Sequence, residues 1–126
     1  LAALLHDVGY HINYQGHHKH SYHLILHADL LGVSPEEQVI VAHVARYHRG
    51  SVPNRRRHRD YSQLDAAARR RIRRLAAILR VADGLDREQR RRERVRRGRP
   101  PRDDARDDAL YCGRVIIRRI RLQTER

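Results

Sequence analysis

The chain has 126 residues, a formal net charge of +13 and a single cysteine, Cys112. This length predicts one small domain, because a typical domain holds roughly 100–150 residues. No apolar run is long enough for a membrane-spanning helix, and no basic-then-apolar start resembles a secretory signal. One cysteine excludes an internal disulfide framework. We therefore expect a soluble protein of the reducing cytoplasm with no membrane partner.

The basic excess favours a polyanionic partner, but it is unevenly distributed. Residues 1–45 carry Lys19 against four acids, a net charge of −3, whereas residues 46–126 carry 27 Arg against 11 acids, a net charge of +16. Arg almost wholly replaces Lys, and Met, Phe and Trp are absent, which is typical of a GC-rich genome. Codon usage therefore explains part of the charge, and nucleic acid is the less favoured partner.

The chain starts within an apolar run, Leu1-Ala2-Ala3-Leu4-Leu5, with neither an initiator methionine nor a helix-capping residue. We interpret it as a piece of a longer protein. Leu1 to Val8 has helical apolar spacing and Gly9 supplies a stop, so it predicts the end of a buried helix. Residues 9–18 have no period and predict a loop. A second helix is expected over residues 20–31, ended by Gly32.

Ser34-Pro35-Glu36-Glu37 is a strong helix-start signal, because Ser34 and Glu37 have the spacing of a capping box and Pro35 suits the first position. It predicts a helix over residues 35–48. An exposed loop should follow over residues 49–61. The next helix is expected after Ser62 and should end near Gly84, with an apolar stripe of Leu64, Ala68, Ile72, Leu75, Leu79 and Ala82.

These patterns predict an all-α bundle divided into three parts. Residues 1–87 should form the helical domain. Residues 88–109 are nearly all charged and predict either a solvated helix or an Arg-rich linker. Residues 110–126 regain an apolar pattern and predict a short strand or hairpin.

Two acids fall on helix faces that otherwise point to the core. Asp7 follows Leu4 and Leu5, and Asp83 comes four residues after Leu79. A buried carboxylate needs a cation or several donors to offset its burial. His6 precedes Asp7, His48 lies on an apolar face seven residues after Val41, and His20 opens the second expected helix. Imidazole and carboxylate ligands together suit a divalent ion, so these five residues are the candidate metal ligands.

The other histidines are interpreted differently. His43 lies about 140° around its helix from His48 and should face elsewhere. Surface or packing roles are expected for His17, His18, His23 and His27. The cations that flank the candidate site are Lys19, Arg46 and Arg49.

Four strings in order resemble the C-terminal HD domain of the exopolyphosphatase and guanosine pentaphosphate phosphatase (Ppx/GppA) family. They are Leu5-His6-Asp7-Val8-Gly9, His17-His18-Lys19-His20-Ser21, Ala45-Arg46-Tyr47-His48-Arg49 and Leu79-Arg80-Val81-Ala82-Asp83-Gly84-Leu85-Asp86-Arg87. The resemblance covers residues 1–87 and implies an HD-like helical fold that binds a divalent ion (Mg, Mn, Zn or Fe) and hydrolyses phosphate esters and anhydrides.

Carried over by position, the resemblance assigns His6 and Asp7 to the signature pair and Asp83 to the late aspartate. His20 and His48 match the histidines that hold a second ion in two-metal HD enzymes. The first histidine of the superfamily set is expected upstream of Leu1. The implied reaction is metal-assisted hydrolysis, with His6 and Asp7 as catalytic residues.

The implied substrates are polyphosphate or a guanosine polyphosphate, whose phosphate oxygens the flanking Lys19, Arg46 and Arg49 would bind. In this family the chain-processing site belongs to an N-terminal phosphatase domain, which is expected outside this chain, and the HD domain assists in substrate binding or in forming a homodimer. Two alternatives stay open. One is a polyanion-binding or dimerisation module without catalysis, and the other is a free-standing HD nucleotide phosphohydrolase.

Overall fold

The computed structural model describes residues 1–98, and over that range it contains helices and loops without strands. In chain order the elements are α1 (Ala2–Leu5), the 3-10 helix η1 (Val8–His11), α2 (His17–His27), α3 (Pro35–Tyr47), α4 (Arg59–Gln63) and α5 (Ala66–Arg96). The predicted all-α fold is confirmed. The strand expected over residues 110–126 lies outside the described residues.

Helix α3 is the centre of the bundle and begins as its sequence predicts. The Ser34 hydroxyl accepts from the Glu37 amide at 3.3 Å, and the Glu37 carboxylate accepts from the Ser34 amide at 3.0 Å. This capping box satisfies two amides that would lack partners at the helix start. The helix ends at Tyr47, so His48 becomes its C-cap residue. The C-terminal end of α3 therefore presents His48 to the site.

Helix α5 differs from its prediction at both ends. Ser62 lies inside the short α4, and Asp65 is the N-cap, accepting from the amides of Ala67 and Ala68. The helix does not stop at Gly84 but continues to Arg96. Beyond that glycine, acid–Arg pairs four residues apart support it, at Asp83–Arg87, Asp86–Arg90, Glu88–Arg92 and Glu93–Arg97. The segment 88–96 is thus a solvated helix.

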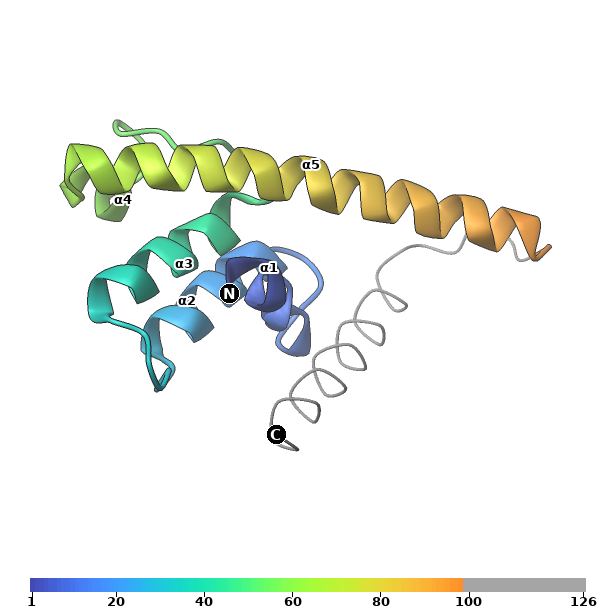
Figure 1. Ribbon diagram of the computed structural model, residues 1–126, viewed down its shortest axis with the longest axis horizontal. Helices are drawn as coiled ribbons and strands as arrows, with labels where there is room; N and C mark the ends of the chain where they lie inside the picture. The colour runs from blue at the N-terminus through green and yellow to red at the C-terminus, as the bar shows by residue number, and fades with distance from the viewer. Residues whose placement is uncertain (99–126) are drawn as a thin grey trace.

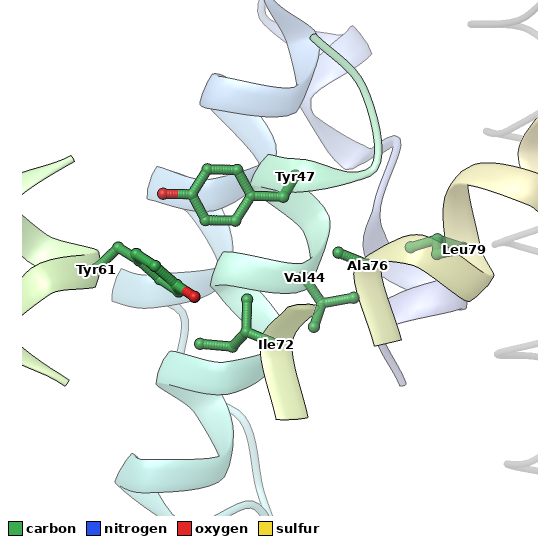
Figure 2. Packing of buried hydrophobic residues seen from close by; sticks show 6 residues of the cluster. All are labelled: Val44, Tyr47, Tyr61, Ile72, Ala76 and Leu79. Carbon is green, nitrogen blue, oxygen red and sulfur yellow. The ribbon is translucent and has the colours of Figure 1, made fainter. Parts of the chain in front are cut away.

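The core has two apolar clusters, one on each side of α3. Between α3 and α5, Val44 and Tyr47 pack against Ile72, Ala76 and Leu79, and Tyr61 of α4 closes the end (Figure 2). A fully buried aliphatic side chain such as Ile72 contributes about 1.5–3 kcal/mol to stability. The second cluster, between α2 and α3, contains Tyr22, Ile25, Ala42 and Ala45.

Only part of the stripe predicted for α5 faces this core. Leu75 is 46 % exposed, and the buried face is instead Ile72, Ala76, Leu79 and Asp83. Ile78, Val81 and Leu85 are also exposed. Figure 1 shows α5 lying across α3 and extending well past the other helices. None of the helices in residues 1–98 is both long and apolar enough to span a membrane.

Close packing of η1 on α2 fixes the start of the chain. Gly9 donates its amide to the Ser21 hydroxyl at 2.9 Å, and a Cβ at this position would lie 2.1 Å from the His17 carbonyl oxygen. Only glycine permits this approach. Helix α2 begins at His17, three residues earlier than predicted, after Gly16 in the left-handed conformation (φ 74°). Asp7, which precedes η1, is thereby held beside the first turn of α2.

Candidate metal centre

Asp7 is the centre of a buried cluster of three imidazoles. Its side chain is 8 % exposed, and its Oδ2 lies 3.1 Å from His6 Nε2. Its Oδ1 lies 3.4 Å from His17 Nε2 and 3.3 Å from His48 Nε2. Ligand atoms of His6, Asp7 and His48 all lie within 4.8 Å of one another. The N-terminal segment and the end of α3 thus bring His6, Asp7 and His48 to one point, and α2 places His17 directly beside them.

Backbone carbonyls determine which ring nitrogen of each histidine faces Asp7. All three Nδ1 atoms lie within hydrogen-bond distance of a carbonyl oxygen three residues earlier: Ala3 for His6 (3.0 Å), Tyr14 for His17 (3.1 Å) and Ala45 for His48 (2.5 Å). A carbonyl only accepts, so each Nδ1 carries the proton and each Nε2 presents a lone pair in the neutral ring. This is the outer arrangement that usually orients a histidine toward a metal.

The converging lone pairs require a positive charge among them. His17 Nε2 lies only 3.2 Å from His48 Nε2, a distance at which two neutral acceptors repel each other. Burial lowers the pKa of His17 to about 4, so this ring is neutral at pH 7. A proton or a metal ion must therefore offset the repulsion.

The charges of the cluster follow from its hydrogen bonds. Without a metal, burial disfavours the charged form of Asp7, but hydrogen bonds that the protonated rings of His48 and His6 donate through Nε2 outweigh it and hold the pKa of this carboxyl well below its usual range. Burial also disfavours charge on His6, and its bond to Asp7 outweighs this and raises its pKa. Without a metal, His6 is thus the imidazole most suited to carry a proton.

Asp83 lies beside this cluster but is engaged by arginines. Its Oδ2 lies 2.9 Å from Arg87 Nη2 and 3.9 Å from Arg49 Nε. Burial and the negative charge of Asp7 raise the pKa of Asp83, whereas the charges of His48 and Arg49 lower it. Arg49 also donates to the Tyr10 hydroxyl at 3.0 Å. Tyr10 in turn stacks on His17 with ring centroids 4.1 Å apart. Arg49 thus links Asp83, through Tyr10, to a histidine of the cluster.

The predicted ligands divide into three groups. His6, Asp7 and His48 are brought together, and Asp83 lies nearby in ion pairs with Arg87 and Arg49. His20 is half-buried one turn after His17, close to Gly9, and contributes none of the contacts that join the cluster in residues 1–98.

His17 takes the place beside Asp7 that the sequence had suggested for His20, whereas surface or packing was the role expected for His17. The prediction of a loop over residues 9–18 includes His17, whereas the structure begins α2 at this residue. A signal was present in Gly16, which fits the left-handed N-cap, and in the four-residue spacing of His17 and Ser21, both of which are buried.

Among the predicted phosphate-binding cations, the one that contacts the site is Arg49. Arg46 instead lies over the rings of Tyr22 and Tyr47, at 5.0 Å and 5.9 Å from their centroids. Lys19 is exposed on α2. Arg87 was missed because the charged run after Asp83 was interpreted as solvated surface.

The imidazole nitrogens of His6 and His48 and a carboxylate oxygen of Asp7, with His17 Nε2 beside them, are a donor set suited to a first-row divalent ion. Two guanidinium groups beside them suit the oxygens of a phosphate group. The residues present therefore fit both a metal ion and a phosphorylated ligand. A model of the family described as Ppx/GppA phosphatase, domain III, matches residues 1–107. No solved structure gives a significant match to the chain.

Proposed function

The chain belongs to the Ppx/GppA phosphatase family through its domain III, and on this premise we propose that it binds a divalent metal ion and serves in the hydrolysis of polyphosphate or guanosine polyphosphate. The observation that carries the proposal is the convergence of three Nε2 lone pairs on the Asp7 carboxylate. Such a convergence is costly for a buried cluster without a cation.

The protein's own residues supply three roles in this proposal. His6, His17 and His48 bind the ion through Nε2, while their Nδ1 protons stay on backbone carbonyls. Asp7 supplies the negative charge. When bound, a divalent ion polarises a phosphoryl oxygen and lowers the pKa of a water molecule. Arg49 and Arg87, which are 22 % and 33 % exposed, can hold phosphate oxygens at the edge of the buried cluster.

A second candidate is polyanion binding without catalysis. Helix α5 carries 12 Arg against four acids, a net charge of +8 over residues 66–96, and most of these arginines are exposed. A long cationic helix suits a polyphosphate chain. Exposed Ile78, Val81 and Leu85 on the same helix would suit a homodimer contact or a neighbouring domain.

Metal loading and hydrolysis separate the two candidates. The purified chain is dialysed against Zn²⁺ or Mn²⁺, the bound metal is counted, and phosphate release from polyphosphate is measured. We expect metal binding that His48→Ala weakens by at least about tenfold. His20→Ala is the matched control and should leave affinity unchanged.

A chain that binds no metal would contradict the metal proposal. Polyphosphate binding that is steeply salt-dependent, without metal or turnover, would favour the second candidate. Hydrolysis that survives both metal removal and His48→Ala would exclude the cluster as its source.

A further inference from the structure

We propose that Arg87 and Arg49 hold the Asp83 carboxylate in reserve, and that a phosphate-class anion releases it as an additional ligand for the metal. Anion and metal would then bind cooperatively. The inference rests on the proposed metal site and concerns how that site is regulated. It starts from the observation that the late aspartate of the HD pattern is paired with arginine rather than gathered with the histidines.

The Asp83–Arg87 pair is built into one turn of α5. Arg87 Nη2 lies 2.9 Å from Asp83 Oδ2, and Arg87 Nε donates to the Asp83 backbone carbonyl at 3.3 Å. Arg49 approaches the same carboxylate oxygen from the segment that follows α3. The side chain of Asp83 is 5 % exposed, whereas both arginines are accessible from solvent. A ligand can thus reach the guanidiniums but not the carboxylate.

Phosphate competes directly for the guanidinium groups. Arginine binds carboxylate and phosphate through the same forked geometry, and a phosphate group carries more charge than one carboxylate. If phosphate occupies Arg87 and Arg49, Asp83 keeps a buried negative charge without its ion pairs. Losing one partner of a buried pair is strongly unfavourable unless another cation replaces it.

The metal cluster is the cation site within reach of Asp83. Arg49 directly follows His48, approaches Asp83 Oδ2 at 3.9 Å and donates to Tyr10, whose ring stacks on His17, so the Asp83 carboxylate lies on the side of the cluster. A metal ion there would gain a second carboxylate when the arginines turn to phosphate. Because coupling between two ligands is reciprocal, phosphate should tighten metal binding and metal should tighten phosphate binding by the same factor.

The test is a titration of the 126-residue chain with Co²⁺, with and without inorganic phosphate, followed by the visible absorption of the bound ion and corrected for Co²⁺ bound by free phosphate. In the wild type we expect phosphate to tighten Co²⁺ binding about fivefold or more. Arg87→Gln should bind Co²⁺ more tightly without phosphate, by roughly threefold to fivefold, and should gain little from phosphate. Arg92→Gln, which breaks the exposed pair with Glu88 on the same helix, is the matched control and should resemble the wild type.

Asp83→Asn gives the second measurement. Its Co²⁺ affinity without phosphate should fall only by the lost attraction of the Asp83 charge, and the enhancement by phosphate should disappear. Arg87→Lys keeps the charge without the fork and should fall between the wild type and Arg87→Gln. Circular dichroism of each variant verifies the helical fold.

Three outcomes would overturn the inference. If wild-type chain binds Co²⁺ but Arg87→Gln binds it no better, the arginine does not restrain Asp83, and the metal site itself still stands. If Asp83→Asn keeps the full enhancement, phosphate acts by binding the metal directly. If the wild type binds no Co²⁺, the proposed metal site fails and the inference fails with it.

Discussion

Gly9 positions the cluster because it has no side chain and therefore lets η1 pack closely on α2. Its Cα lies so close to α2 that a Cβ would approach the His17 carbonyl oxygen to 2.1 Å and the Ser21 amide nitrogen to 2.5 Å. Both neighbours are backbone atoms of a packed helix, so neither can move cheaply. The residues on the two sides of this contact, Asp7 and His17, are members of the cluster. Packing and site geometry therefore depend on the same contact.

Gly9→Ala should lower the free energy of unfolding by about 2 kcal/mol or more, because η1 must separate from α2. The same change should weaken metal binding, since it moves Asp7 away from His17. Urea unfolding followed by circular dichroism measures the first effect. Gly84→Ala is the control, because Gly84 is helical with open space around it, and it should stabilise α5 by about 0.5–1 kcal/mol. Equal effects at both glycines would contradict the packing argument.

Tyr47 and Tyr61 are both buried tyrosines, but they differ in whether the hydroxyl group has a hydrogen-bond partner. Within residues 1–98 the Tyr47 hydroxyl has no hydrogen-bond partner, and burial raises its pKa to about 12. The Tyr61 hydroxyl donates to the Arg69 carbonyl at 3.3 Å. Removing an unpaired buried polar group is neutral or stabilising, whereas breaking a bond leaves its acceptor unsatisfied.

Tyr47→Phe should therefore leave the free energy of unfolding unchanged or raise it by up to about 1 kcal/mol, and Tyr61→Phe should lower it by about 0.5–1.5 kcal/mol. Chemical denaturation of the two variants under identical conditions gives the comparison. A loss of more than about 1 kcal/mol in Tyr47→Phe would reveal a buried partner for its hydroxyl, such as an ordered water molecule.

At the scale of elements, local chemistry explains which helix ends could be predicted. The start of α3 is encoded by side chains, since Ser34 and Glu37 bond each other's amides, and this boundary was predicted correctly. The start of α2 has no side-chain cap and depends on the left-handed Gly16, which is a weaker sequence signal than a capping box. The prediction placed it three residues late, which exchanged His17 for His20 in the candidate site.

The end of α5 was mispredicted for a different reason. Gly84 predicts a helix end, but a glycine within a helix costs only about 1 kcal/mol, so the helix can continue through it. Ion pairs such as Glu88–Arg92, at 2.9 Å, stabilise the part of the helix beyond Gly84. Each pair contributes little to helix stability, but a series of them contributes enough to extend the helix. The gathering of His6, Asp7 and His48 could be predicted from their apolar faces. The pairing of Asp83 with Arg87 could not, because spacing alone does not distinguish a surface arginine from one that turns inward.

Ser34→Ala should lower the free energy of unfolding by about 1 kcal/mol, since the Glu37 amide loses its acceptor. Because α3 contacts α1, α2 and α5, this loss should appear in the global transition and not as local fraying. Thermal unfolding monitored at 222 nm measures it. Ser62→Ala is the control, because Ser62 bonds a carbonyl within the short, exposed α4 and caps no helix. A global loss in the control as large as that in Ser34→Ala would contradict the capping argument.

At the scale of the whole molecule, the uneven charge has a structural counterpart. The acidic and His-rich residues 1–45 build most of the cluster, and the Arg-rich remainder supplies α5, which lies across α3 and extends past the bundle (Figure 1). The two halves meet where Arg49 and Arg87 approach Asp83. Two of the arginines behind the net charge of +13 thus lie at the site itself, and the others contribute a positive electrostatic potential around it.

Buried neutral histidines make the metal-free fold sensitive to mild acid. Burial lowers the pKa of His17 and His18 to about 4 and also lowers that of His43. Their ordinary pKa is 6.5, so between pH 6.5 and about 4 the unfolded chain binds more protons than the folded one, and stability falls as the pH falls. His6 acts in the opposite sense, because its bond to Asp7 outweighs its burial and raises its pKa. Burial also lowers the pKa of His58, whereas burial raises that of Asp83, which acts in the same sense as His6. With four rings against these two groups, the net effect is destabilisation by acid.

We therefore expect the urea midpoint, measured in the presence of a chelator, to decline steadily from pH 6.5 toward pH 4. His43→Leu should decline less steeply, because it removes one ring that must stay neutral and whose Nε2 has no hydrogen-bond partner among the described residues. His27→Leu, at an exposed ring on α2, is the control and should follow the wild type. A midpoint that stays constant over this range, or an unchanged slope in His43→Leu, would mean that the buried rings already accept protons in the folded state.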